Sequence, residues 1–345
     1  MSEMPDPVSL SARASVSSVL RRRVTALTVF VAGAAAGVLG LQALGAAPAP
    51  PGDAPVVSAS LSTVSTVSSL AAGPRKDEPG TTFRIASLNV LGHGHTAPGG
   101  NRKGWRQGPE RMRMQLDVLL AEKVDVIGFQ ELQKPQYDVF RAATAGQFAT
   151  WPGNIGGRSF LRNSIAWRTA TWTLVDTSWI KVPYFKGDML RMPVVLLQHN
   201  VTGQQAYFMN FQNPANARGN ADRWRAQGRS MQMDLVNRLR VTSGLPVFWT
   251  GDFNDREKAF CDITRNSDLV SASGGTNAGG RCLPTKPMAV DWIFGSSETA
   301  WSDYSLDARY KIRKSTDHPL VLATATVPPG LVPVCTPVPE PPVDS

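Results

Sequence analysis

Apolar and polar positions along the middle of the chain alternate between patterns typical of strands and of helices. Short apolar runs bounded by turn residues are typical of buried strands. The clearest such runs are Phe83–Asn89, Val124–Phe129, Pro246–Thr250 and Leu320–Ala325. Further strands, several of them consecutive and therefore expected to pair antiparallel, are predicted at Asn163–Arg168, Thr171–Ile180, Met192–Asn200, Gln205–Phe211 and Val290–Phe294.

Two other segments repeat apolar residues at the spacing of one helix face. They are Gly108–Lys123, with Met112, Leu116, Leu119 and Leu120, and about Asn220–Arg240, with Met231, Leu235 and Leu239. The order strand, helix, strands, helix, strands predicts an α+β domain in which two sheets pack face to face with helices outside. We place this domain at residues 81–327, and a chain of 345 residues with 42% hydrophobic content is long enough to build it.

The two ends of the chain differ in composition from this domain. Residues 1–23 end in three arginines, and an uncharged apolar run follows over residues 24–47. Basic residues before such a run indicate a cytoplasmic n-region followed by a signal peptide or a membrane anchor. Cleavage and retention both stay open, so the product is expected to be secreted or membrane-anchored, with the N-terminal segment contacting the membrane. Residues 48–80 have the composition of a disordered linker and residues 328–345 that of a proline-rich tail.

Three cysteines lie in the C-terminal third of the chain. Cys261 and Cys282 bracket a loop rich in Gly, Ser and Asn at Ser271–Gly280, and Cys335 is left over in the tail. An exported protein can keep disulfides, and no CxxC pair or nearby histidine favours a metal site here. We therefore expect a Cys261–Cys282 bridge, with Cys335 free or in an intermolecular bond.

The formal net charge of the whole chain is +9. A basic surface attracts polyanions such as nucleic acid or anionic lipid head groups. A high isoelectric point is also common among exported proteins that bind neither, so the charge only tilts the expected substrate towards nucleic acid. Nothing in the sequence implies a protein partner.

Four short polar motifs lie at the ends of predicted strands. They are Ser87-Leu88-Asn89-Val90, Gln130-Glu131-Leu132, Gly251-Asp252-Phe253-Asn254 and Thr316-Asp317-His318-Pro319. Polar groups at strand ends meet at one edge of a sheet. Carboxylates, amides and one histidine gathered there can hold Mg²⁺ or Mn²⁺ against a phosphate and activate a water.

Together with Val290-Asp291-Trp292-Ile293-Phe294, these motifs resemble, in order and spacing, those of the endonuclease/exonuclease/phosphatase superfamily. That superfamily includes deoxyribonucleases, abasic-site endonucleases, inositol polyphosphate phosphatases and bacterial sphingomyelinases. The resemblance runs from residue 83 to about residue 325. It implies a four-layered α/β/β/α sandwich of two mostly antiparallel sheets with helices outside, and a site at the top of the sheets.

The resemblance also implies a metal site. Glu131 would be the main ligand, Asn89 would supply an amide oxygen, and Asp317 would lie close to the ion, which we expect to be Mg²⁺, Mn²⁺ or Ca²⁺. In isolation, Glu131 could equally be a solvated carboxylate at a strand end. His93 and His95 lie in a glycine-rich loop without a third imidazole placed beside them, and we do not assign them to the main site.

The catalytic roles follow from the same resemblance. Asp252 would position or deprotonate the attacking water, and Asn254 would donate to a phosphate oxygen. His318 would face the scissile phosphate as a base or as a protonated stabiliser, oriented by Asp291. The competing interpretations are an ordinary tight turn at Gly251–Asn254 and a structural, hydrogen-bonded His318.

One position departs from the family pattern. Many members carry a histidine after the central strand, where this chain has Gln212. A glutamine can donate and accept hydrogen bonds but cannot exchange a proton near neutral pH, and a lost acid catalyst can cost about 10²–10⁴-fold in rate. Abasic-site enzymes also lack a histidine there, so the substitution does not by itself indicate an inactive protein.

These observations predict an exported or membrane-anchored, divalent-metal-dependent phosphodiesterase, nuclease-like, that uses in-line attack of water. A phospholipid phosphodiesterase similar to sphingomyelinases is one alternative. A catalytically silent binding module with the same fold is another, which Gln212 favours and which the motif residues oppose. A fold-level resemblance does not determine the substrate, so DNA, RNA, phospholipid and a small phosphomonoester all stay open.

Overall fold

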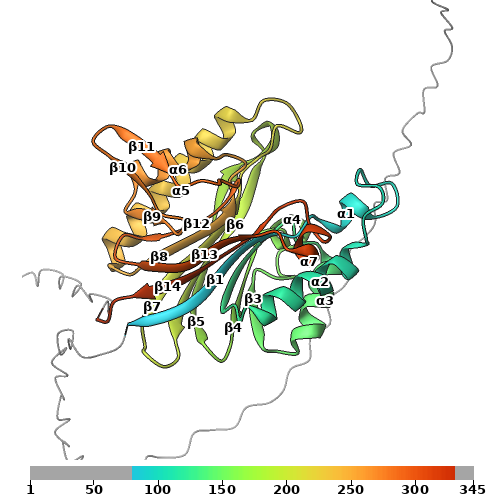
Figure 1. The fold of residues 1–345 in the computed structure, drawn as a ribbon, viewed down its shortest axis with the longest axis horizontal. Coiled ribbons are helices and arrows are strands. Elements are labelled where there is room, and N and C mark those ends of the chain that lie inside the picture. Colours follow the sequence, from blue (N-terminus) through green and yellow to red (C-terminus); the bar gives the residue numbers. More distant parts are fainter. Residues whose placement is uncertain (1–79, 331–345) are drawn as a thin grey trace, which may run out of the picture. The chain divides into compact units, whose positions relative to one another are not determined.

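The computed structural model describes residues 80–330, which form two six-stranded sheets packed face to face with helices on the outside (Figure 1). The first sheet has the strand order β13 (Ala300–Asp307), β14 (Leu320–Val327), β1 (Thr81–Asn89), β2 (Val126–Gln130), β4 (Ser164–Arg168), β3 (Phe148–Trp151). The second has the order β5 (Trp172–Pro183), β6 (Met189–His199), β7 (Gln205–Gln212), β8 (Val247–Asp252), β12 (Asp291–Ser296), β9 (Leu269–Ser271). The predicted sandwich of two mostly antiparallel sheets is thereby confirmed.

The two sheets share one pattern of pairing at their centres. In the first, β1 is parallel to β2 and antiparallel to β14. In the second, β7 is parallel to β8, which is antiparallel to β12. In each sheet, therefore, two strands end and an antiparallel strand begins at the same edge, and this edge receives the polar motifs.

Aromatic side chains fill the space between the sheets. Phe83 of β1 packs edge-on against Trp172, Phe208 and Phe248 of the second sheet, with ring centroids 5.0–5.6 Å apart. These rings are at most 2% exposed. Edge-to-face pairs stabilise beyond the area that they bury, and truncating a buried phenylalanine to alanine typically costs about 3–5 kcal/mol. Phe83→Ala is therefore expected to loosen the packing of the two sheets.

Helices cover both outer faces. On the first sheet lie α2 (Gly108–Ala121) and α3 (Lys134–Thr144), with the single turns α1 (His93–Thr96), α4 (Arg158–Leu161) and α7 (Tyr310–Arg313) near its edges (Figure 1). On the second lie α5 (Asp222–Ser243) and α6 (Glu257–Asn266), whose apolar faces pack with β7 and β8. The predicted helices at Gly108–Lys123 and Asn220–Arg240 correspond to α2 and α5.

Several elements were not predicted from the sequence. Helix α3 buries Gln136, Phe140 and Thr144, so two of the three residues on its inner face are polar and its apolar period is hidden. Strand β13 is mostly exposed or half-exposed, which leaves no apolar run. The segment predicted as a loop at Ser271–Gly280 is partly paired, because β10 (Gly275–Ala278) forms a hairpin with β11 (Arg281–Pro284). Helix α6, strand β3 and strand β9 are short, and they were missed as well.

The structure contains a disulfide between Cys261 of α6 and Cys282 of β11, as the sequence predicts. The bridge ties the β10–β11 hairpin to the outer helix of the second sheet. Within residues 80–330, none of the helices combines the length and the apolar character needed to span a membrane. The segments predicted at 1–23 and 24–47, all but the last residue of the linker predicted at 48–80, Cys335 and most of the tail predicted at 328–345 lie outside the described residues.

Candidate active site

The strand register brings the predicted site residues to one edge of the sandwich. Asn89 is the last residue of β1 and pairs with Gln130, so Glu131 follows directly at the end of β2. Gln212 at the end of β7 pairs with Asp252 at the end of β8, and Asp252 pairs in turn with Asp291 at the start of β12. His318 precedes β14. A cavity of about 680 Å³ is lined by Glu131, Gln212, Asp252, Asn254, Asp317 and His318.

A buried polar cluster joins the two sheets directly below this edge. The Gln130 amide donates to the Asn210 oxygen at 2.6 Å, and the Asn210 amide donates to the carbonyl of Phe129 at 2.7 Å. Thr250 donates to the same Asn210 oxygen. A side chain at Gly128 would place its Cβ 2.0 Å from the Thr250 hydroxyl, so glycine is needed for this close approach. The cluster fixes the distance between the end of β2 in the first sheet and the end of β8 in the second.

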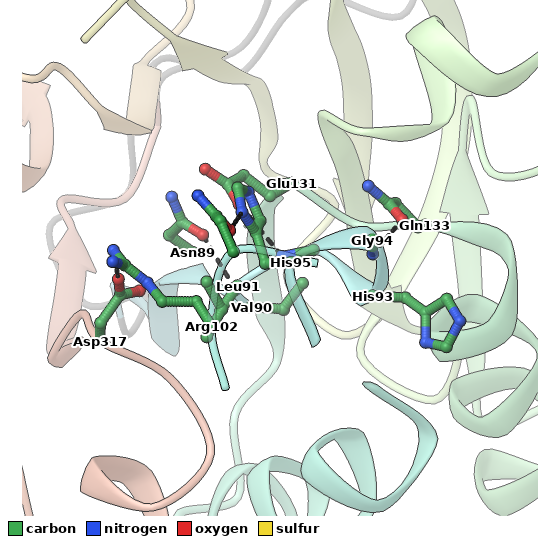
Figure 2. Close-up of polar contacts among 12 residues, drawn as sticks. Asn89, Val90, Leu91, His93, Gly94, His95, Arg102, Glu131, Gln133 and Asp317 are labelled. Atoms are coloured by element: carbon green, nitrogen blue, oxygen red, sulfur yellow. Dashed lines mark hydrogen bonds and ion pairs between the residues drawn. The ribbon is translucent and has the colours of Figure 1, made fainter. Parts of the chain in front are cut away.

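Several hydrogen-bond donors hold Glu131 at the edge of the first sheet, facing the cavity. Its backbone is left-handed, with φ at 59°, which turns its side chain out of the strand and into the cavity. Its carboxylate accepts from the Gly92 N–H at 3.0 Å and from Gln212 at 3.2 Å, and His95 Nε2 lies 3.2 Å away (Figure 2). Burial opposes its charge, but His95, Gly92 and Asn89 outweigh burial and lower the pKa of Glu131 to about 2. The carboxylate is therefore anionic at neutral pH.

Asp252 has the opposite environment at the end of the second sheet. It is 1% exposed. Four N–H groups donate to it at 3.0–3.3 Å, from the side chains of Asn89 and Gln212 and from both the backbone and the side chain of Asn254. Burial and the charge of Asp291 nevertheless raise the pKa of Asp252 above its usual range. A carboxylate with a raised pKa can take up and release a proton near neutral pH.

His318 and Asp291 form a hydrogen-bonded pair. The two carboxylate oxygens of the fully buried Asp291 lie 2.8 and 3.0 Å from Nδ1 of His318, which leaves Nε2 as the nitrogen that can meet a ligand in the cavity. Burial disfavours the imidazolium, but the charge and hydrogen bond of Asp291 outweigh burial and raise the pKa of His318 to about 10. The histidine is therefore a cation at neutral pH, and the orienting role expected of Asp291 matches this contact.

Asp317, expected to lie close to the metal, is engaged by another residue. Its carboxylate forms an ion pair with Arg102 at 2.6 Å at the rim of the cavity (Figure 2). Asn254, expected to donate to phosphate, points its amide at Asp252 and at the Asn213 carbonyl. Gln212 donates to both Glu131 and Asp252, so the residue at the atypical position connects the two sheets.

The structure adds residues that were not predicted from the sequence. His95 contacts Glu131, and three arginines line the cavity: Arg102, Arg162 and Arg218. The Gly-His-Gly-His segment between two ligand motifs was a signal for His95. The arginines are set far apart in the chain and give no local pattern, so only the tertiary fold gathers them.

A buried arginine also joins two backbone segments next to the site. Arg111 of α2 donates to the carbonyls of Val90 at 2.7 Å, Leu91 at 2.5 Å and Ser315 at 2.9 Å. These carbonyls belong to the segments that follow β1 and precede β14. Because a fully buried guanidinium needs its donors satisfied, Arg111 keeps the two segments together beneath Glu131 and His318.

Two groups of residues have the chemistry to hold a divalent cation. In one, the anionic Glu131 opens into the cavity, a quarter of its side chain being exposed, beside the Asn89 amide. Hard oxygen donors of this kind suit Mg²⁺, Mn²⁺ or Ca²⁺. In the other, potential ligand atoms of Asp252, Asp291 and His318 lie within 4.8 Å of one another. Side chains in both groups already have hydrogen-bond partners, and the Asn89 oxygen accepts from the Leu91 N–H at 3.0 Å. Asp252 and Asp291 are each 1% exposed, whereas Glu131 opens into the cavity, so the first group is more accessible to a cation.

The model of the Endonuclease/Exonuclease/phosphatase family matches residues 86–318. The chain belongs to the endonuclease/exonuclease/phosphatase family. This match confirms the membership indicated by the motifs, and it covers every predicted site residue from Asn89 to His318. Members of the family are phosphoester hydrolases and typically use a divalent metal. A search of curated protein sequences returned no match.

Solved structures of family members have the same fold. A family protein from Bacteroides thetaiotaomicron superposes with a TM-score of 0.56 at 17% identity, over 72% of this chain and 95% of that one. A mannosyl-6-phosphatase from the same organism gives 0.51 at 15%, over 70% and 98%. TDP2 from D. rerio, in complex with a single-strand DNA product, gives 0.51 at 17%, over 71% and 99%. At these identities the likeness shows the fold.

Proposed function

We propose that this family member is a divalent-metal-dependent phosphodiesterase that cleaves its substrate by in-line attack of water. The observation that carries the proposal is the pair of unlike carboxylates at the sheet edge. Glu131 is anionic and opens into the cavity, whereas Asp252 is buried, held by four N–H donors, and lies opposite the Asp291–His318 pair. Binding of the cation is thus assigned to Glu131, and transfer of the proton to Asp252.

Each residue has a role that its contacts allow. Bound at Glu131 and Asn89, a divalent cation would neutralise negative charge that develops on the phosphate. Asp252 would accept a proton from the attacking water as the water oxygen bonds to phosphorus and the bond to the leaving oxygen breaks. The His318 imidazolium would stabilise the added charge on the phosphate oxygens through Nε2.

Two amides complete the set. Asn254 keeps Asp252 oriented through two hydrogen bonds, and in the substrate complex its amide can turn to a phosphate oxygen. In the substrate complex Gln212 can turn one of its two N–H groups from a carboxylate to the leaving oxygen, but it cannot supply a proton. The leaving group is therefore expected to be one that departs without strong acid catalysis at this position.

The alternative of a silent module receives less support. A module without catalysis has no need for a buried, desolvated carboxylate beside a carboxylate–imidazole pair. Burying charged groups costs free energy unless they are paired, and strongly perturbed carboxylates gathered in a cleft are typical of catalytic sites.

Nucleic acid is the substrate class that we favour. Arg102, Arg162 and Arg218 line the cavity around the proposed phosphate position, and arginines are suited to binding phosphates beside the one that is cleaved. The fold accommodates other substrates, since one structural neighbour is a sugar phosphatase and another holds a single-strand DNA product. A phospholipid phosphodiester is the alternative, and its zwitterionic or singly charged head group would use the arginines less.

Export remains part of the proposal. The Cys261–Cys282 disulfide would persist outside the cytoplasm and not in a reducing cytosol. Together with the apolar run at residues 24–47, it supports a secreted or membrane-anchored enzyme. Fractionation of cells that express the full chain should recover the protein outside the cytoplasm, and a purely cytoplasmic product would contradict this location.

The function is tested by a substrate panel with and without chelator. DNA, RNA, sphingomyelin and an artificial phosphodiester are each incubated with the full chain and with Glu131→Gln as a matched control. We expect cleavage of at least one phosphodiester that requires an added divalent cation, with DNA or RNA preferred. Full activity in excess chelator would contradict the metal dependence, and no turnover on any substrate would favour the silent module.

A further inference from the structure

Hydrogen bonds from the surrounding backbone fix the position of His95. It lies in the single turn α1, after a segment whose backbone is tied to the residues that follow β2. The N–H of His93 donates to Gln136 at 2.8 Å and that of Gly94 to Gln133 at 2.8 Å. Together with the Gly92 N–H on Glu131, three consecutive backbone donors bind one neighbouring segment. The turn is therefore fixed relative to Glu131.

The close packing of this turn explains its glycines. A Cβ at Gly92 would lie 2.8 Å from the Gln133 amide, and a Cβ at Gly100 would lie 2.3 Å from the His95 carbonyl. Real Cβ atoms do not approach backbone that closely, so Gly100 needs glycine, whereas at Gly92 the Gln133 side chain would have to move. The two histidines of the turn then diverge: His95 is directed at Glu131, and His93 points away from it (Figure 2).

The contact between His95 and Glu131 has the dimensions of two ligands on one ion. Nε2 of His95 lies 3.2 Å from Oε2 of Glu131. Two ligand atoms that each lie about 2.1 Å from an octahedral ion, at right angles, are separated by about 3.0 Å. The observed separation is close to that value, and both residues line the same cavity.

The other ring nitrogen is held in the way expected of a metal-bound histidine. Nδ1 of His95 lies 2.8 Å from the side-chain oxygen of Asn101. Histidines that bind metals usually donate their second N–H to such an oxygen, which fixes the tautomer and leaves the other nitrogen free to coordinate. With a cation bound, Nδ1–H would donate to Asn101 and the Nε2 lone pair would be free to coordinate beside the Glu131 carboxylate, in place of the direct contact between His95 and Glu131.

We infer that His95 is a nitrogen ligand of the catalytic cation, beside Glu131 and Asn89. This inference rests on the metal site of the proposed function and adds to its oxygen ligands. It has a consequence for metal choice, because imidazole binds later first-row ions better than it binds Mg²⁺ or Ca²⁺. The site is therefore expected to prefer an ion such as Co²⁺ to Mg²⁺ more strongly than a site of oxygen ligands alone would.

A counter-ion role is the competing explanation, and it predicts the opposite sign. If His95 only balances the charge of Glu131, an incoming cation must displace it, so removing His95 would leave metal affinity unchanged or increase it. If His95 is a ligand, its removal must weaken binding. The direction in which metal affinity changes when His95 is removed therefore distinguishes the ligand role from the counter-ion role.

The test measures metal binding directly. The full chain, His95→Ala, His93→Ala and Glu131→Gln are titrated with Co²⁺ and with Mg²⁺ by calorimetry. We expect His95→Ala to weaken Co²⁺ binding by at least about tenfold and Mg²⁺ binding by less, while His93→Ala, a histidine two residues away in the same turn, changes neither. His95→Gln serves as a second variant if the alanine variant loses its fold.

Pulsed electron paramagnetic resonance of bound Mn²⁺ supplies an independent readout. A ¹⁴N coupling from imidazole should be present in the native protein and in His318→Ala, and absent in His95→Ala. Unchanged or tighter Co²⁺ binding in His95→Ala, or a coupling that disappears only in His318→Ala, would overturn the inference and leave the Glu131 site in place. If Glu131→Gln binds both ions as tightly as the native chain, or the native chain binds neither, the metal site of the proposed function fails instead.

Discussion

The ends of the two sheets carry similar side chains in different surroundings. At the end of the first sheet, Glu131 opens into the cavity among groups that favour its negative charge, and its pKa falls to about 2. At the end of the second sheet, Asp252 is buried next to Asp291, and its pKa rises. Both lie at the end of a strand of a parallel pair, so the difference arises from their neighbours and not from their place in the fold. One carboxylate is suited to holding a cation and the other to exchanging a proton.

The largest loss of activity is expected at Asp252. Asp252→Asn keeps the size of the side chain but removes the group that accepts the proton of water. We expect the turnover number to fall by about 10²–10⁴-fold, the usual contribution of a general base, while the metal dissociation constant changes little. Steady-state kinetics and calorimetric metal titration would check both. A comparable loss of metal affinity would show that Asp252, and not Glu131, is the main ligand.

Asp291 controls the charge of the histidine that links the sheets. Activity should need Asp252 deprotonated and His318 protonated, so it should rise with pH through the pKa of Asp252 and fall through that of His318, at about 10. In Asp291→Asn the imidazolium loses its carboxylate, and the pKa of His318 should move towards its ordinary value of 6.5. The alkaline limb of the pH–rate profile should therefore shift to lower pH. If the alkaline limb does not shift, it reflects the titration of a group other than His318.

Gln212 connects the two carboxylates through its side-chain N–H groups. Hydrogen bonds to charged groups contribute about 1.5–3 kcal/mol, so Gln212→Leu should lower turnover by roughly ten- to a hundredfold. Gln212→His, which restores the residue common in the family, should leave turnover equal or raise it, because imidazole can also protonate a leaving oxygen. Rates on one phosphodiester compare the two variants. If Gln212→His is as slow as Gln212→Leu, the position serves to bridge the sheets and does not contact the leaving group.

The disulfide should affect the second sheet without affecting the site. Cys261 and Cys282 are 21 residues apart in sequence, and closing a loop of that size stabilises the fold by about 3 kcal/mol in the chain-entropy account. Cys261→Ser with Cys282→Ser should lower the melting temperature and keep the turnover number within about twofold at 25 °C. A larger loss of turnover in the folded variant would show that the hairpin β10–β11 influences the cavity.

The sequence predicted the core strands and the two long helices because their apolar residues follow a simple period. It missed α3, whose inner face includes Gln136 and Thr144, since polar residues buried by hydrogen bonding carry no hydrophobic signal. The strand-end motifs predicted which residues would converge, because ends of neighbouring strands meet at one sheet edge.

The electrostatic difference between Glu131 and Asp252 was not predictable from the motifs. It depends on groups that only the tertiary fold brings together, such as His95 beside one carboxylate and Asp291 beside the other. The Arg102–Asp317 pair has the same origin, since its members are 215 residues apart. Local sequence thus indicates which strand-end side chains reach the site, whereas the cavity arginines and the pKa of each carboxylate depend on long-range packing.

Metal rescue tests the division between the two carboxylates most directly. The turnover of Glu131→Gln and Asp252→Asn on an artificial phosphodiester is measured at increasing concentrations of Mg²⁺, up to saturation. We expect Glu131→Gln to recover much of its activity at high Mg²⁺, because its defect is in holding the cation. Asp252→Asn should stay about 10²-fold or more below the native rate at every concentration. Rescue of Asp252→Asn by Mg²⁺ while Glu131→Gln stays inactive would contradict the assignment of both residues.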